Sequence, residues 1–336
     1  MKLIHETHDR WEEALYVQAD QGKVQRSFAL DAHLAFPDAD DGLLRLDDFA
    51  RFSETEVRNE RFFEVPAGYD PVVTDVADGI QFPSALQTET EANDTVHVKV
   101  SEARNRAHAL VVFHHWRADA YNGVVAGLLS RLGISVYEMA LPYHLSRAVP
   151  GVADFNDFVS PNLGKTVRAI RQGVFDGGQV ISILKRQGYG KISVMGTSLG
   201  SWVAGLVAAH DGSVQKAALL LAGGDAARAI WSARTTRHIK AVIDTELSLH
   251  DLERAWAVLN VENYVGKMAR PNFEAKFILG NRDPAIIPEI SRSLIDAMND
   301  VGVTVDVSWL NCGHASLSRL PYSAMAAYQL VRFLRR

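Results

Sequence analysis

Short apolar runs alternate with longer amphipathic stretches from about residue 105 to the C-terminus. The apolar runs predict buried strands, and the stretches between them carry apolar residues at the three- and four-residue spacing of helices. The predicted strands are 108–115, 134–142, 191–196, 216–224, 275–281 and 303–311, and the predicted helices are 120–133, 166–188 and 199–212. This alternation predicts an α/β fold, with a mostly parallel central sheet flanked by helices on both faces.

Two segments depart from this rhythm. Residues 225–270 form a long, mainly helical insertion between two strands, which is typical of a lid or cap. The N-terminal part predicts a helical extension with Trp11, Leu15 and Val17 on one side. We therefore expect an N-terminal helical extension at 1–60, an α/β core domain at 61–224 and 271–336, and a helical cap at 225–270.

Smaller features refine these elements. Residues 61–68 and 94–103 predict antiparallel strands, because apolar and polar residues alternate in the second of them. Within the helix at 166–188, Gly177 and Gly178 allow a break or a kink.

Composition and charge exclude several classes of protein. The chain has 336 residues and a formal net charge of -5, with no Lys/Arg cluster along one face, so we expect no nucleic-acid partner. The N-terminal residues are charged where a signal peptide needs an apolar core. No stretch reaches the roughly 20 apolar residues of a membrane span, so we expect a cytoplasmic protein. Cys312 is the only cysteine and predicts a buried or half-buried free thiol, without a disulfide or a cysteine-based zinc site.

The pentapeptide GTSLG at 196–200 places Ser198 between two glycines, after a predicted strand and before a predicted helix. A residue on so sharp a turn is strained and needs neighbours without side chains, which Gly196 and Gly200 provide. The Ser198 hydroxyl would then be exposed at the carboxyl end of the sheet. The Leu199 amide would point into the same space at a helix N-terminus, so this context predicts a nucleophile elbow.

A serine hydroxyl is a weak nucleophile and needs a histidine base and an acid that orients the histidine. Asp283, in the sequence GNRDPAIIP, follows one predicted strand, and His314, in NCGHASL, follows the last one. Asp225 also follows a strand and is the alternative acid. The turn-forming NRDP favours Asp283, because it suits an acid held in a tight loop.

From about residue 62 to its end the chain resembles the α/β-hydrolases, in the three loops GTSLG, GNRDPAIIP and NCGHASL. The resemblance implies Ser198 as nucleophile, Asp283 as the orienting acid and His314 as the general base. The N-terminal part and ALPYHLSR at 140–147 are also similar to the family of α/β-hydrolase-domain-containing protein eighteen.

The oxyanion hole needs a second amide besides that of Leu199, and in this fold it comes from the loop after the strand at 108–115. The family commonly has His-Gly before the donor residue, whereas this chain has His114, His115 and Trp116. By position, Trp116 supplies the amide. His115 must then take the backbone angles that glycine usually takes.

Several other residues are candidates for the surroundings of the site. Adjacent histidines diverge on extended backbone, so His114 and His115 predict loop residues that shape the pocket rather than metal ligands. Arg147 and Arg282 either bind an anionic group of the substrate or are solvated, and Trp202 is predicted in the core. The candidates to line the pocket are His115, Tyr143, His144 and Arg147.

These patterns predict a serine hydrolase that cleaves a small or medium ester, thioester or amide through an acyl-enzyme, without a cofactor or a metal. The expected partner is a small-molecule ester, and a homo-oligomer is left open. Three alternatives stay open: an acyltransferase with the same triad, a peptidase of the prolyl-oligopeptidase type, and a non-catalytic protein of this fold that binds a ligand.

Overall fold

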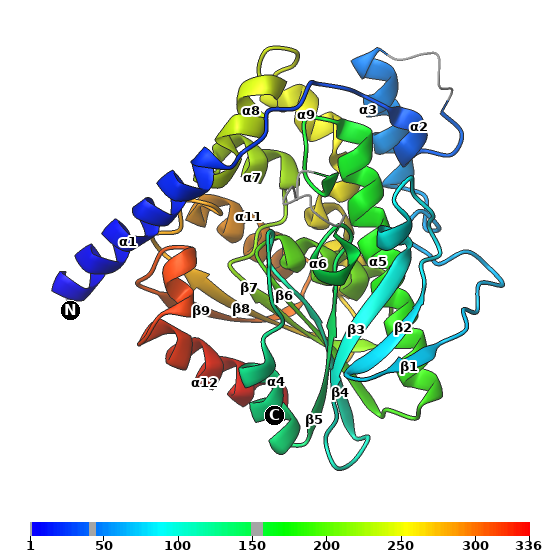
Figure 1. Cartoon of the computed structure of the whole chain (residues 1–336), viewed down its shortest axis with the longest axis vertical. Coiled ribbons are helices and arrows are strands. Elements are labelled where there is room, and N and C mark those ends of the chain that lie inside the picture. Colours follow the sequence, from blue (N-terminus) through cyan, green and yellow to red (C-terminus); the bar gives the residue numbers. More distant parts are fainter. Residues whose placement is uncertain (1, 40–44, 149–156) are drawn as a thin grey trace.

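The computed structural model describes residues 2–39, 45–148 and 157–336 (Figure 1). Its strands form one nine-stranded sheet in the order β1-β2-β3-β5-β4-β6-β7-β8-β9. The strands are β1 (Thr74–Val76), β2 (Gly79–Pro83), β3 (Thr95–Ser101), β4 (His108–Phe113), β5 (Ile134–Met139), β6 (Lys191–Thr197), β7 (Val214–Leu220), β8 (Glu274–Gly280) and β9 (Thr304–Leu310).

The sheet is mostly parallel, which confirms the predicted α/β fold. Strand β2 is antiparallel to both β1 and β3, and β3 is antiparallel to β5, whereas every neighbouring pair from β5 to β9 is parallel. The predicted strand at 61–68 is wrong: these residues form turns, and Phe62 and Phe63 are buried in the core. Their apolar character serves packing rather than strand pairing.

Alternating side chains on the strands divide the interior into two layers. In β4, Ala109, Val111 and Phe113 face the layer that contains α5 (Leu163–Arg186), α6 (Leu199–His210) and α11 (Pro288–Asp300). Leu110 faces the other layer, which contains α4 (Gly123–Arg131) and α12 (Tyr322–Arg335). Both faces of the sheet are therefore covered by helices, as the near-continuous apolar runs require.

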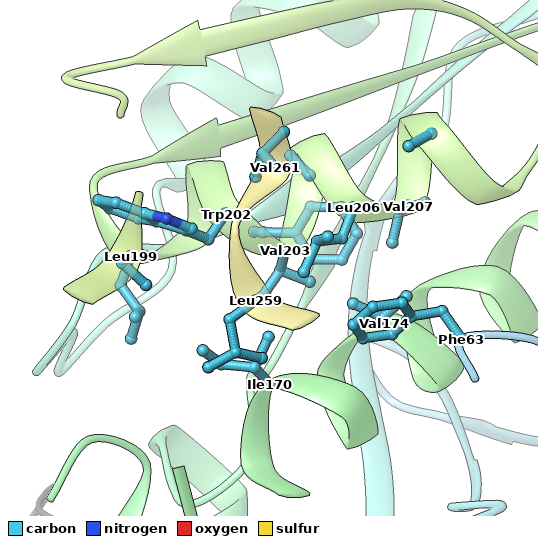
Figure 2. Close-up of a cluster of buried hydrophobic side chains, with 14 of the residues drawn as sticks. Phe63, Ile170, Val174, Leu199, Trp202, Val203, Leu206, Val207, Leu259 and Val261 are labelled. Carbon is cyan, nitrogen blue, oxygen red and sulfur yellow. The ribbon is translucent and has the colours of Figure 1, made fainter. Parts of the chain in front are cut away.

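Helix α6 lies at the centre of the larger layer. Figure 2 shows Val203 and Leu206 of this helix among side chains of α5 and of the segment that carries Leu259 and Val261. The anticipated break in α5 is absent, because the helix runs without interruption past Gly177 and Gly178. A Cβ at Gly177 would lie 2.9 Å from Phe113 and 3.0 Å from Val207, so this glycine allows close packing.

The segment between β7 and β8 is mainly helical, in agreement with the sequence pattern. Its α-helices are α7 (Ala226–Ser232), α8 (Arg237–Ile243), α9 (Leu249–Ala255) and α10 (Val265–Met268), joined by short 3₁₀ turns. Trp256, Leu259 and Val261 of this segment are fully buried in the same hydrophobic core as the sheet.

The N-terminal part contains α1 (Lys2–Gln21), α2 (Ala32–Ala35) and α3 (Leu46–Glu56). Helix α1 runs along one side of the molecule, beside the cap and the loop after β9 (Figure 1). Of the three apolar residues predicted on one side of α1, Trp11 and Leu15 are half-buried, whereas Val17 is 49% exposed. Glu12 and Tyr16, one turn apart, are buried. The sequence pattern did not predict the burial of this pair, because a carboxylate one helical turn from a tyrosine does not form an apolar stripe.

The proposed domain boundaries remain predictions, and residues 1, 40–44 and 149–156 within them lie outside the described part of the chain. None of the helices in the described ranges has both the length and the apolar character needed to cross a membrane.

Candidate active site

Ser198 lies on the turn between β6 and α6, with φ of 53°, in the left-handed region that L-residues seldom adopt. Its amide donates to the carbonyl of Leu220 at 2.9 Å. A Cβ at Gly196 would lie 2.1 Å from the carbonyl oxygen of Gly200, and a Cβ at Gly200 would lie 2.2 Å from that of Phe113. The two glycines therefore let the strand, the turn and the helix approach closely enough to form this elbow.

His314 and Asp283 approach Ser198 from two different loops. His314 Nε2 lies 2.9 Å from Ser198 Oγ, and His314 Nδ1 lies 2.7 Å from Asp283 Oδ2. The other carboxylate oxygen of Asp283 accepts the amides of Ala285 and Ile286, each at 2.8 Å. The three side chains form one continuous chain of hydrogen bonds, although they are widely separated in sequence.

The two candidate acids occupy different places. Asp225 caps the N-terminus of α7 and accepts the amide of Arg228 at 3.0 Å. Asp283, by contrast, is 4% exposed and contacts His314 directly. The geometry therefore favours Asp283 as the partner of the histidine.

The charge state of His314 is set by its carboxylate neighbours. Burial alone would lower the pKa of this imidazole, because it disfavours the charged form. The charge and hydrogen bond of Asp283, together with the charge of Glu12, outweigh burial and raise the pKa of His314 above its ordinary value. The site is thus built to stabilise an imidazolium.

The loop after β4 brings Trp116 to the same pocket as Ser198 and Leu199. Leu199 is the first residue of α6, where an amide has no acceptor within its own helix. The expected glycine-like backbone is displaced by two residues: Arg117, not His115, has a positive φ, of 61°. His115 is exposed to solvent and does not line the pocket.

Two histidines hold this loop in place. His114 Nε2 accepts the amide of Leu141 at 3.0 Å, and His144 Nε2 accepts the amide of Arg117 at 3.1 Å. Their Nδ1 atoms lie 2.8 Å from the carbonyls of His115 and Pro142, so each ring donates from Nδ1. A ring that accepts at Nε2 is neutral. In agreement, burial lowers the pKa of His114 well below its ordinary value and that of His144 to about 4.

Ser198 opens into an apolar pocket of about 550 Å³, its open mouth included. Ser198, Leu199 and Trp116 were predicted at this site, but most of the other lining residues were not, because they come from helices whose spatial neighbours the sequence does not reveal. Among those, only Ala285 and Ile286 carried a signal, through their position after Asp283. The lining residues are Trp116, Val159, Thr166, Ile170, Ser198, Leu199, Trp202, Ala226, Ala229, Ile230, Ala233, Thr235, Thr236, Trp256, Ala285 and Ile286.

Three predicted pocket residues lie elsewhere. Arg147 is fully buried and forms an ion pair with Asp176 at 2.8 Å. Tyr143 is buried with its hydroxyl 3.3 Å from Arg168 Nη2, and His144 supports the loop after β4 rather than the pocket. These polar side chains face the protein interior because they satisfy other buried polar groups there.

The remaining candidates are also placed. Arg282 pairs with Asp9 of α1 and donates to the carbonyl of Asn311 at 3.1 Å, so it is turned away from the pocket. Trp202 is buried in the core, as predicted (Figure 2). It also borders the pocket. Cys312 is a buried free thiol whose pKa is raised to about 12 by burial. In the described ranges, no group of three or more His, Cys, Asp or Glu side chains could hold a metal ion.

No protein-family model matches this chain, and no curated protein matches its sequence. Among solved structures, it is similar to the acylaminoacyl peptidase of Pyrococcus horikoshii, with 12% identity and a TM-score of 0.61. That match covers 80% of this chain and 41% of the peptidase, so this chain spans about two-fifths of the peptidase's length.

Two acetyl xylan esterases match over nearly their full length. Esterase 1 of Thermoanaerobacterium sp. JW/SL YS485 has 14% identity and a TM-score of 0.59, with 93% of this chain and 96% of that one covered. The enzyme of Paenibacillus sp. R4 has 14% identity and a TM-score of 0.57, with 95% and 98% covered. These likenesses establish the fold: the chain has the α/β-hydrolase fold, as predicted.

Proposed function

We propose that this protein is a serine hydrolase that cleaves a small or medium carboxylic ester, and by the same chemistry a thioester or an amide. The observation that carries the proposal is the hydrogen-bonded chain from Asp283 through His314 to Ser198, at the edge of an apolar pocket. A nucleophile, a base and an orienting acid in these contacts are the arrangement that activates a serine.

In this mechanism, Asp283 accepts a hydrogen bond from the Nδ1–H of His314, which leaves the Nε2 lone pair facing Ser198 Oγ. His314 takes the hydroxyl proton as Oγ bonds to the carbonyl carbon, and the amides of Leu199 and Trp116 bind the resulting oxyanion. His314 then gives the proton to the leaving alcohol, and the acyl-enzyme remains. Water attacks the acyl carbon, His314 accepts its proton, and the acid is released as the proton returns to Ser198.

The pocket lining supports an apolar acyl or alcohol group of limited size. Ile230 and Trp256 of the cap, Ile170 of α5 and Ile286 after Asp283 present hydrocarbon surface beside Ser198. Among the lining residues that the structure describes there is no Lys or Arg, which favours a neutral group over an anionic one.

The first test of this function is labelling with a fluorophosphonate, which reacts only with an activated serine. The wild type should be labelled, and Ser198→Ala and His314→Ala should not. Ser182→Ala, on the far part of α5 where its hydroxyl binds Arg186, is the matched control and should label like the wild type. An unlabelled wild type would contradict the proposal.

The pocket is tested with p-nitrophenyl esters of increasing acyl length. Ile230→Ala removes hydrocarbon from the lining and should shift the preferred acyl chain by roughly one or two carbons toward longer esters. Val242→Ala, in the same cap but not in the lining, is the control and should leave the profile unchanged. An unchanged profile in Ile230→Ala would place the acyl group elsewhere.

The charged N-terminal residues also lead us to propose a cytoplasmic location. The N-terminal part and the sequence at 140–147 lead us to propose a relation to the family of α/β-hydrolase-domain-containing protein eighteen. A purified preparation tested for size in solution decides whether the protein forms a homo-oligomer.

A further inference from the structure

A carboxylate from the N-terminal helix reaches the loop that carries His314. Glu12 of α1 is 4% exposed. Its Oε1 accepts the amide of Ala315 at 2.9 Å, and its Oε2 accepts the amide of Ser316 at 3.2 Å. Glu12 therefore binds the two backbone amides that directly follow His314.

The sequence around His314 is adapted to this contact. A Cβ at Gly313 would lie 2.3 Å from Glu12 Oε2, so a side chain there would displace the carboxylate. The amide of Gly313 donates to Ser316 Oγ at 2.8 Å. Together these bonds fix the backbone on both sides of the histidine.

Helix α1 is held at several points that keep Glu12 in register. Asp9 pairs with Arg282, next to Asp283 in the chain, and Trp11 lies under the guanidinium of Arg319 at 3.9 Å. On the cap side, Glu13 and Asp20 of the helix pair with Arg234. Just after the helix, Lys23 Nζ donates to the carbonyl of Thr235, a pocket residue of the cap, at 2.7 Å. The helix thus contacts the acid loop, the histidine loop and the cap.

Two carboxylates act on the charge of His314. Asp283 lies on its Nδ1 side and Glu12 of α1 lies behind its backbone, while Tyr16 donates to Glu12 Oε1 at 2.6 Å. Burial and the Glu12 charge raise the pKa of Tyr16, so its phenol stays protonated and donates.

The nearby cations have other partners. Arg282 pairs with Asp9, and Arg234 of the cap pairs with Glu13 and Asp20 while lying over the ring of Tyr16. The charge of Glu12 accordingly acts on His314 in the same direction as that of Asp283.

Burying a carboxylate costs free energy unless its contacts compensate for the lost hydration. For Glu12, those contacts are made with the loop that carries His314. We propose that Glu12 is a positioning residue, which holds the His314 loop where Nε2 meets Ser198 and stabilises the imidazolium through its charge. The inference rests on the proposed hydrolase function for its kinetic consequences. The effect of the Glu12 charge on the His314 imidazole is expected in the folded protein whatever reaction the protein catalyses.

The test compares Glu12→Gln, Glu12→Asp and Glu12→Ala with Glu6→Gln, a control on the exposed face of α1. In NMR titrations of the His314 imidazole without substrate, Glu12→Gln should lower the pKa, whereas Glu6→Gln should leave it unchanged. Tyr16→Phe removes a hydrogen-bond donor that shields the Glu12 charge, so it should raise the pKa of His314. Opposite shifts of the His314 pKa in Glu12→Gln and Tyr16→Phe distinguish an effect of the Glu12 charge from a general loosening of the fold. Both shifts can still be measured if Glu12→Ala fails to fold.

With an ester substrate, Glu12→Gln should lower kcat about tenfold with KM within about twofold, and should move the acid limb of the pH profile to lower pH. Glu12→Asp, which keeps the charge, should lose less activity than Glu12→Ala. An unchanged His314 pKa in both Glu12→Gln and Tyr16→Phe would overturn the inference. A wild type that fails to react with fluorophosphonate would overturn the proposed function instead, and the titration would still decide the role of Glu12.

Discussion

At the scale of single residues, Asp283 shows how a side chain is aimed by its own loop. The amides of Ala285 and Ile286 hold one carboxylate oxygen, so the other is directed at His314. The acid therefore needs no cationic partner to fix its rotamer, because two backbone donors two and three residues away do so.

Replacing Asp283 tests its assignment against the alternative acid. Asp283→Asn should lower kcat by about 10³- to 10⁴-fold, because the amide no longer fixes the productive tautomer of His314. Asp225→Asn keeps a side chain that caps helices well and should leave kcat near that of the wild type. The measurement is kcat for one p-nitrophenyl ester, and the reverse ranking would reassign the acid.

The electrostatics of His314 predict the pH dependence of catalysis. The imidazole must be neutral to accept the Ser198 proton, and its pKa is raised above the ordinary 6.5, chiefly because Asp283 outweighs burial. The acid limb of kcat/KM should therefore have its midpoint above 6.5. A midpoint below 6.5 in the wild type would show that burial, rather than the carboxylates, sets the charge of the histidine.

At the scale of elements, the loop after β4 depends on two histidines that must stay neutral. His144 accepts an amide of this loop and His114 accepts one from the strand end beside it, both through Nε2. Protonation replaces each acceptor with a donor that faces another donor. The loop that carries Trp116 is consequently sensitive to acid.

This arrangement predicts a loss of stability at low pH. The pKa of His144 is about 4 in the folded protein and about 6.5 when unfolded, so the unfolded chain binds more protons between these values. The free energy of unfolding should fall as pH decreases from about 6.5 to about 4, by about 3 kcal/mol for this residue. Urea unfolding at several pH values measures this loss of unfolding free energy. The control is His144→Gln, which has no titratable group at this position. Identical pH slopes in the two proteins would contradict it.

The elements were predictable where one local pattern determines them. The strands around GTSLG, the helix that follows it and the loops with Asp283 and His314 carry their signals within a few residues. The burial of Arg147 and of Glu12 is not predictable in this way, because their partners Asp176 and Ala315 lie far away in sequence. The pocket lining was missed for the same physical reason, since it is formed by packing between helices.

At the scale of the whole molecule, the extension, the cap and the sheet share one hydrophobic core. Phe36 and Phe49 of the N-terminal part and Trp256 of the cap belong to the same cluster as Phe113 and Phe277 of the sheet. Regions that bury their apolar surface against one another lose it together when one of them opens.

We therefore expect the three regions to unfold as one unit. Hydrogen exchange in increasing denaturant should give peptides of α3, of α9 and of β8 the same opening free energy at their most protected amides. Peptides of α3 or α9 that open well before those of β8 would instead identify the extension or the cap as an independent domain.

The contact of Glu12 with the loop after β9 has a consequence for how the protein is made. It joins positions 303 residues apart, and a ribosome adding about 5 to 20 residues per second needs about 15 to 60 s to synthesise that length. During this interval Glu12 has already been synthesised, whereas the loop whose amides will donate to its carboxylate has not been translated. Ser198 and the glycines beside it are likewise synthesised before His314. The hydrogen bond between Ser198 and His314 therefore forms only after the loop that follows β9 has been translated.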